Sequence, residues 1–169
     1  MRNQNITQWA DDLATTKERQ ARASLCIEYV GEQKEYCCLG LGSTLVPKMQ
    51  IKQVGTGDLT PDGRSKFAFG RTGATSLAPY EFMVWLGYDE DDLIPFDAGE
   101  YDVYFDIPYS IKERSIDAQN NAAFDDDPSL DGSGVPLVNN SAASLNDDGF
   151  TFKQIADVIR YFGLSDEVR

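Results

Sequence analysis

The segment from residue 151 to residue 163 restricts the possible folds of this sequence more than any other. Thr151 and Gln154 have the spacing of a capping box, in which each side chain satisfies a backbone N–H at the start of a helix. Apolar residues then recur on one helical face, and Gly163 stands where the helix would end. This apolar stripe consists of Phe152, Ile155, Ala156, Ile159 and Phe162. We therefore expect an amphipathic helix over 151–162, preceded by a short helix within 141–149.

Two other main helices are predicted by the same kind of spacing. Residues 5–19 place apolar side chains on one helical face, and Asn5 is in position to cap the N-terminus. Residues 78–86 form the second helix, in which Pro79 takes the first helical position and Gly87 marks the end.

Three strands are predicted by alternation of apolar and polar residues, over 23–30, 65–70 and 100–107. The dipeptide Asp62-Gly63 is a hairpin turn signal ahead of the second strand. In the third strand, the alternation places Asp102 on an acidic outer face. The sequence thus predicts an α+β fold, with three main helices packed on a small, mostly antiparallel sheet.

The excess of negative charge is confined to one part of the chain. The formal net charge is −13, yet residues 1–87 hold ten Lys and Arg against nine Asp and Glu, whereas residues 88–131 hold two against fourteen. We therefore expect a single domain over residues 1–169 that carries a long acidic loop, an insertion at about 88–135. A chain with this excess of negative charge repels the phosphate backbones of nucleic acids, so direct nucleic-acid binding is not expected.

The sequence contains no histidine, which removes the commonest general base near neutral pH and the Ser-His and Cys-His nucleophile systems. Carboxylates are too numerous for any pair to stand out as an acid and a base. These features favour a non-enzymatic role, although they leave enzyme activity open. The apolar runs are short and the first residues lack the features of a secretory signal, so neither membrane insertion nor export is expected.

Three cysteines, Cys26, Cys37 and Cys38, are best interpreted as reduced, buried thiols. Their number is odd, and the adjacency of two of them strains any bridge between them and leaves no gap for a zinc knuckle. The alternative is a reactive thiol, which would need a neighbouring cation or a helix N-terminus to activate it. We also expect a short helix to begin near Cys37.

Three motifs occur in an order that resembles a family of small, uncharacterised proteins of tailed bacteriophages. The motifs are an aromatic-CCLG element, a helix ending in WLG, and an NDxG-x-[ST]-F-x-x-IAD-x-I helix. The matching residues are Trp9, Tyr36–Gly40, Pro79, Trp85–Gly87, Leu145–Gly149, Thr151, Phe152 and Ile155–Asp157. The resemblance implies a phage genome and a cytoplasmic location in the bacterial host, but no activity. The matched residues are either scaffold or a shared ligand site around Cys37, Cys38, Asn146 and Asp147.

The acidic insertion contains an incomplete calcium-loop pattern. Asp127, Ser129 and Asp131 alternate ahead of a glycine, as in the opening of such a loop, and Asp125 lies nearby. The twelfth position is Val138, which cannot supply the usual bidentate carboxylate. The alternatives are a solvated acidic loop or a surface that imitates nucleic acid. No cofactor other than Ca²⁺ is suggested.

A basic and glycine-rich segment is the other candidate site. Arg64, Lys66 and Arg71 lie among glycines, and such backbone with cations can cradle a phosphate, which suggests a pocket for a small nucleotide signal. No phosphate-loop motif is present, so an ordinary exposed hairpin is the alternative.

The function that these features favour is a phage-encoded, non-enzymatic accessory protein. It would bind a host or phage protein, or a small signalling molecule, during infection, in counter-defence or host takeover. The alternatives are a structural or decorating component of the virion, and a calcium-binding or nucleic-acid-mimicking module. The sequence leaves the oligomeric state open.

Overall fold

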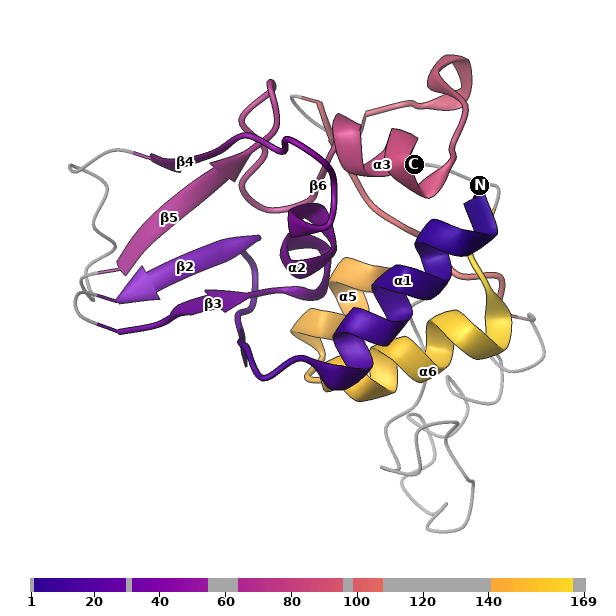
Figure 1. The fold of residues 1–169 in the computed structure, drawn as a ribbon, viewed down its shortest axis with the longest axis horizontal. Coiled ribbons are helices and arrows are strands. Elements are labelled where there is room, and N and C mark those ends of the chain that lie inside the picture. Colours follow the sequence, from indigo (N-terminus) through magenta and orange to yellow (C-terminus); the bar gives the residue numbers. More distant parts are fainter. Residues whose placement is uncertain (1, 30–31, 55–63, 96–98, 108–140, 166–169) are drawn as a thin grey trace, which may run out of the picture.

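A stack of helices forms one part of the molecule, and a twisted sheet projects from it (Figure 1). The computed structural model describes residues 2–29, 32–54, 64–95, 99–107 and 141–165. In these residues the helices are α1 (Arg2–Thr15), α2 (Cys38–Thr44), α3 (Tyr80–Leu86), the 3-10 turn η1 (Glu90–Asp92), α5 (Ala142–Asp147) and α6 (Phe152–Phe162). The strands are β1 (Arg19–Gln20), β2 (Cys26–Tyr29), β3 (Lys34–Tyr36), β4 (Ile51–Val54), β5 (Arg64–Phe69), β6 (Ala78–Pro79) and β7 (Glu100–Tyr101). The predicted α+β class is confirmed.

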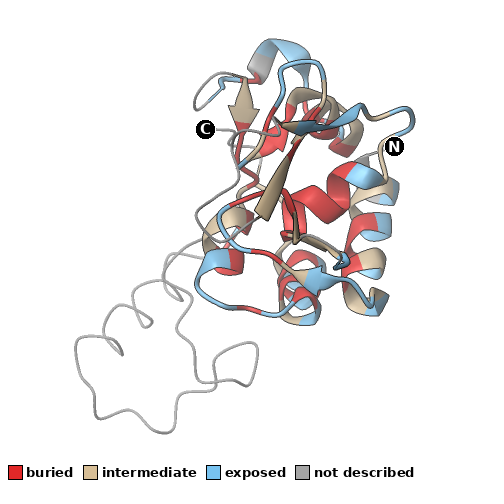
Figure 2. Cartoon of the chain, turned by 90° about the vertical axis from the view of Figure 1, so that its left-hand side faces the viewer, coloured by how far each residue is buried: buried red, intermediate tan, exposed pale blue. Residues whose placement is uncertain are grey.

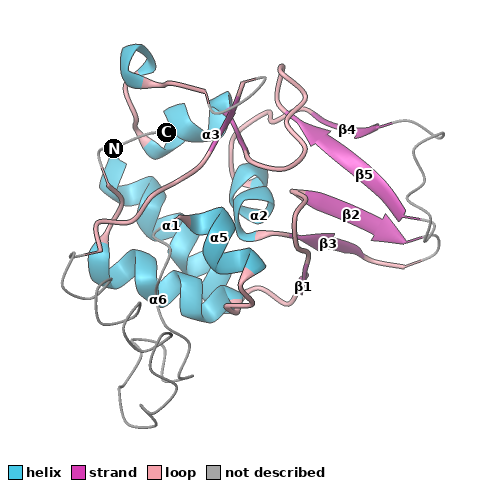
Figure 3. Ribbon diagram, turned by 180° about the vertical axis from the view of Figure 1, so that it is seen from behind, coloured by secondary structure: helices cyan, strands magenta, loops and turns pink. Residues whose placement is uncertain are grey.

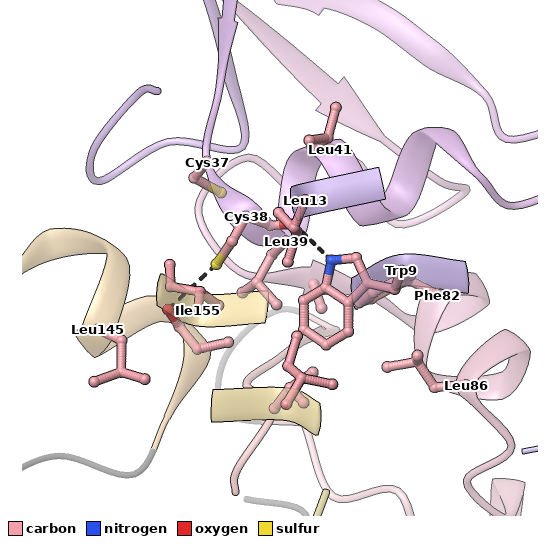
Figure 4. Close-up of a cluster of buried hydrophobic side chains, with 14 of the residues drawn as sticks. Trp9, Leu13, Cys37, Cys38, Leu39, Leu41, Phe82, Leu86, Leu145 and Ile155 are labelled. Atoms are coloured by element: carbon pink, nitrogen blue, oxygen red, sulfur yellow. Dashed lines mark hydrogen bonds between the residues drawn. The ribbon is translucent and has the colours of Figure 1, made fainter. Parts of the chain in front are cut away.

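The helices pack around Trp9, which is fully buried in α1. Its indole N–H donates to the carbonyl oxygen of Cys38 at 3.1 Å, and its ring meets Phe82 of α3 edge-to-face, with centroids 5.3 Å apart. Figure 4 shows this cluster between α1, α2 and α6, with Leu145 and Ile155 beside it. Helices α1 and α6 lie side by side (Figures 1 and 3), and buried segments gather where the helices face one another (Figure 2).

The closing helix agrees closely with its prediction. The capping box of Thr151 and Gln154 is present, α6 ends at Phe162, and Gly163 follows as the C-cap. The short helix within 141–149 is also present, as α5, and it begins after the side chain of Ser141 caps its N-terminus.

Two predicted helix starts are wrong. Helix α1 spans Arg2–Thr15, so it also ends before residue 19, which belongs to β1. Asn5 therefore lies inside the helix and not at its cap, and its side-chain amide donates to the carbonyl oxygen of Trp85. Pro79 belongs to β6, and the extended backbone there (ψ 154°) places it before the first helical residue of α3. The predicted end is confirmed, because Gly87 adopts the left-handed φ of 95° that closes the helix.

The main sheet has five strands in the order β1-β3-β2-β5-β4. All neighbours are antiparallel except β1 and β3, which are parallel, so the sheet is mostly antiparallel as predicted. Phe67 and Phe69 share one face of β5 and are buried in the core. The predicted Asp62-Gly63 turn lies outside the described residues.

The prediction of a long strand over 100–107 is wrong. Only Glu100–Tyr101 form a strand, β7, which pairs with β6 and does not join the main sheet. Asp102 is buried, not on an outer face, because its carboxylate oxygen accepts the backbone N–H groups of Val103 and Ala143. The apolar residues Tyr101, Val103, Phe105 and Ile107 of this segment are nevertheless buried in the core, as the alternation predicts.

The predicted acidic insertion, at about 88–135, is described only in its first part, which contains η1, β7 and the segment up to residue 107. Residues 108–140 lie outside the described residues. Within the part of the chain that is described, no helix is both long and apolar enough to cross a membrane.

Candidate functional site

A cleft runs along one face of α5. It consists of two adjoining hollows of about 320 Å³ and 210 Å³ that share Leu77, Ala143 and Asp147 in their walls. The first is completed by Asp102, Tyr104, Ser144 and Asp148, and the second by Ala23, Ser24, Cys37, Ser76 and Asn146. The lining of the cleft thus combines apolar side chains with hydroxyl and carboxylate groups.

Asn146 joins three segments beneath the cleft. The side chain is only 1% exposed. Its Oδ1 accepts the backbone N–H of Cys38 at 3.1 Å and the side-chain amide of Gln20 at 2.9 Å, while its Nδ2 donates to the carbonyl oxygen of Ala21 at 2.8 Å. Asn146 therefore fixes the start of α2 and the segment before β2 against α5.

Asp147 holds the rim of the cleft. Its Oδ1 accepts the backbone N–H of Ala23 at 2.9 Å, and Ala23 takes a left-handed φ of 56°, which a non-glycine residue rarely adopts. Asp147 and Asp148 are both exposed at this rim.

Asp102 lies at the buried end of the cleft and is 8% exposed. Burial raises the pKa of its carboxyl group above the ordinary 3.8, although hydrogen bonds from Ser141, Ala143 and Val103 act in the opposite direction. The lining of both hollows contains carboxylates and no Lys or Arg among the described residues. The cleft is therefore suited to a cationic group.

The two adjacent cysteines are placed at the start of α2. Cys37 is the N-cap, and its sulfur accepts the backbone N–H of Gly40 at 3.3 Å, while the Cys38 thiol donates to the carbonyl oxygen of Ala142 at 3.3 Å. Burial raises the pKa of Cys37 to about 12 and that of Cys38 well above its ordinary value. Both are free and buried, as is Cys26, so the interpretation as buried thiols is confirmed. The helix N-terminus that the reactive-thiol alternative requires is present at Cys37 and Cys38, but burial outweighs it and raises the pKa of both thiols, which argues against that alternative.

The structure brings together the predicted ligand set of Cys37, Cys38, Asn146 and Asp147. Cys37, Asn146 and Asp147 line one hollow, and Cys38 is hydrogen-bonded to Asn146 directly behind it. Sequence reasoning missed Asp102, because the predicted alternation placed it outside. It also missed the wall formed by Ser24, Ser76 and Leu77, which come together only through packing between distant segments.

The basic trio is not brought together. Arg64 opens β5 and its guanidinium lies 4.8 Å from the centroid of the Tyr29 ring, and Lys66 follows on the same strand. Arg71 lies past the other end of β5, beyond the roughly 17 Å that the strand spans from Arg64 to Phe69. There its Nε donates to Glu81 at 3.2 Å. One phosphate cannot contact all three side chains in this arrangement.

The predicted calcium ligands Asp125, Asp127, Ser129 and Asp131 lie outside the described residues. Among the residues that are described, no group of three or more Asp, Glu or Cys side chains is placed to hold a metal ion.

Comparison with protein-family models, with curated proteins and with solved structures gives no match to this chain. The resemblance to small phage proteins therefore stays a prediction made from the three motifs.

Proposed function

We propose that this chain is a non-enzymatic accessory protein of a tailed bacteriophage, and that it binds a basic side chain of a host or phage protein in the cleft beside α5. The order of the three motifs supports the phage assignment and, with it, the host cytoplasm as the place of action. The lining of the cleft, which among the described residues holds three carboxylates and no Lys or Arg, is the observation that carries the binding role.

The chemistry of the cleft selects the class of ligand. Two exposed carboxylates, on Asp147 and Asp148, stand at the rim, and Leu77 and Ala143 offer an apolar wall. A lysine or arginine side chain fits this arrangement of apolar wall and acidic rim, because its methylene stem packs on apolar surface while its charged end meets carboxylates. A nucleotide phosphate would be repelled, so the site favours a protein partner over a small nucleotide signal.

The volume of the cleft agrees with a side chain as the ligand. The larger hollow, about 320 Å³, lies at the lower end of the range for small-molecule sites, which extends from about 300 to 1,000 Å³. It is large enough for one side chain and its immediate backbone.

The binding role is tested by NMR titration of the folded protein with N-acetyl-arginine methylamide. We expect amide shifts at Ala143, Ser144 and Asp147, and none with the corresponding glutamate amide. Replacing both rim carboxylates, Asp147→Asn with Asp148→Asn, should weaken binding about two- to thirtyfold, because each exposed ion pair contributes about 0.2–1 kcal/mol. Asp157→Asn, an exposed carboxylate on α6, is the matched control and should leave binding unchanged.

The proposal fails if the arginine and glutamate amides shift the same signals, or if Asp157→Asn weakens binding as much as the rim variant does. The biological role is tested by native mass spectrometry of the tagged protein recovered from infected cells, in which an added protein mass is expected. The virion alternative instead predicts a fixed number of copies in purified particles.

A further inference from the structure

The five-stranded sheet has one face that does not belong to the hydrophobic core. In the strand register, Arg19, Glu35, Ile27, Lys66 and Val54 form a row across all five strands, and paired residues of this kind share a face. Ile27 is 5% exposed yet is not part of the core cluster. Its neighbours in the row are Glu35 of β3 and Lys66 of β5, whose methylene stems are long enough to pack on apolar surface.

This outer sheet face, defined as Arg19, Ile27, Tyr29, Glu35, Lys52, Val54, Arg64, Lys66 and Ala68, is positively charged. It carries four cations and one carboxylate in a protein whose net charge is −13. Arg19 forms ion pairs with Glu32 at 3.3 Å and with Glu35 at 3.9 Å. The other cations of the face, Lys52, Arg64 and Lys66, lie on β4 and β5.

The cations of β4 and β5 form a diagonal line. Lys66 is opposite Val54 and Ala68 is opposite Lys52, so Lys52 and Lys66 are diagonal neighbours on one face, about 7–8 Å apart at their Cα atoms. Arg64 continues the line two residues earlier on β5, where it lies over the Tyr29 ring. The line ends at Lys52, which is exposed on β4.

Strand β4 is also an edge of the sheet. It pairs with β5 on one side, and in the part of the chain that is described no strand lies on its other side (Figure 3). Ile51, at the start of β4, is 39% exposed on the face opposite Lys52. An edge strand with an exposed apolar residue is a template for a further strand.

We propose that β4 and the outer sheet face bind an extended acidic segment of a partner protein, which adds to the sheet as a strand beside β4. A strand at this edge would place alternate side chains on the outer face, where acidic residues lie beside Lys52 of β4 and face Lys66 on the next strand. The intervening side chains would lie on the other face beside Ile51, where apolar residues fit. The segment recognised therefore alternates acidic and apolar residues.

The charges also select against two other occupants. A second copy of this chain paired through β4 would bring the two copies of Lys52 close together, and like charges on neighbouring strands are destabilising. A nucleic acid extends well beyond the patch and would meet the field of a chain with net charge −13. A short acidic peptide segment meets only the local positive charge.

The test measures binding of a short labelled peptide in which glutamate alternates with valine, by fluorescence anisotropy at about 0.15 M salt. We expect Lys52→Glu to weaken binding about tenfold, because it replaces an attraction at the edge by a repulsion. Lys153→Glu makes the same charge change at an exposed position on α6 and should alter the affinity less than twofold. Circular dichroism and urea unfolding test whether both variants are folded. If Lys52→Glu is not folded, Lys52→Gln takes its place in the binding measurement.

Hydrogen exchange of the peptide complex distinguishes strand addition from loose charge attraction. We expect slower exchange of backbone amides within Ile51–Val54 when the peptide is bound. The proposal is overturned if the peptide does not bind, if exchange in β4 is unchanged, or if Lys153→Glu weakens binding as much as Lys52→Glu. Concentration-dependent dimers of the free chain would indicate a second copy as the occupant instead. Tighter binding of a single-stranded oligonucleotide of equal charge would indicate a nucleic acid instead. The peptide carries no basic group, so its failure leaves the cleft proposal intact, and the reverse also holds.

Discussion

Replacing Asn146 by alanine is the most informative single perturbation of the cleft. Two buried backbone groups, the N–H of Cys38 and the carbonyl oxygen of Ala21, lose their bonds to this side chain. A buried polar group without a partner costs about 1–3 kcal/mol, so the two together predict a loss of about 2–6 kcal/mol in the free energy of unfolding. With a central value of about 4 kcal/mol, the melting temperature of a domain of this size falls by about 8–16 °C.

Urea unfolding followed by tryptophan fluorescence measures this loss, because Trp9 is fully buried in the core that Asn146 helps to fix. Gln53→Ala removes an amide from an exposed position on β4, where it donates to the Ser65 hydroxyl at 2.9 Å, and should change stability by no more than about 0.5 kcal/mol. A loss below about 1 kcal/mol for Asn146→Ala would refute the view that this side chain joins the three segments.

Three further predictions concern the fold around the site. Gly40→Ala should lower the free energy of unfolding by about 2 kcal/mol or more, because a Cβ there would collide with the carbonyl oxygen of Leu25. Chemical denaturation measures this loss, and an unchanged stability would contradict the close approach of α2 to Leu25. Thr151→Ala removes the capping box of α6 and should cost about 1 kcal/mol in the same assay, with an unchanged midpoint as the contrary result. Asp102→Asn tests a pH dependence: burial raises the folded pKa of Asp102 above 3.8, so its contribution to stability is present below pH 3.8 and is lost as the pH rises through the folded value. The variant should therefore gain stability relative to the natural chain between pH 3 and pH 7, and a relative loss over that range would contradict the direction of the shift.

The elements that the sequence predicts well are those whose signals are local. Helix α6 carries its own capping box, its own apolar stripe and its own terminal glycine, so no distant contact is needed to define it. The end of α3 at Gly87 and the start of α2 at Cys37 follow from equally local features.

The segment 100–107 was mispredicted because burial of alternate residues does not require a paired strand. Tyr101, Val103 and Phe105 are buried as expected, but the chain leaves β7 after two residues. Asp102 then turns inward because backbone N–H groups at the start of α5 need an acceptor, and this need arises only once α5 has packed against the segment. No pattern within the segment records it.

Only part of the candidate cleft could be predicted, because the rest of its lining also depends on contacts between distant segments. The motif residues Cys37, Asn146 and Asp147 come from two patches that the sequence already associates, and the structure places them around one hollow. Ser24, Ser76 and Leu77 have no such association, because their positions depend on how the loops before β2 and β6 pass over α5.

The pairing of α1 with α6 determines when the protein can fold during its synthesis. Helix α1 ends at Thr15 and α6 begins at Phe152, so these two helices, which pack side by side, are separated by most of the chain. Contacts between such distant residues require a large loop to close and slow the formation of the core. On the ribosome, α1 therefore emerges long before its partner and exposes its apolar face until α6 has left the exit tunnel, an interval in which chaperones have access to it.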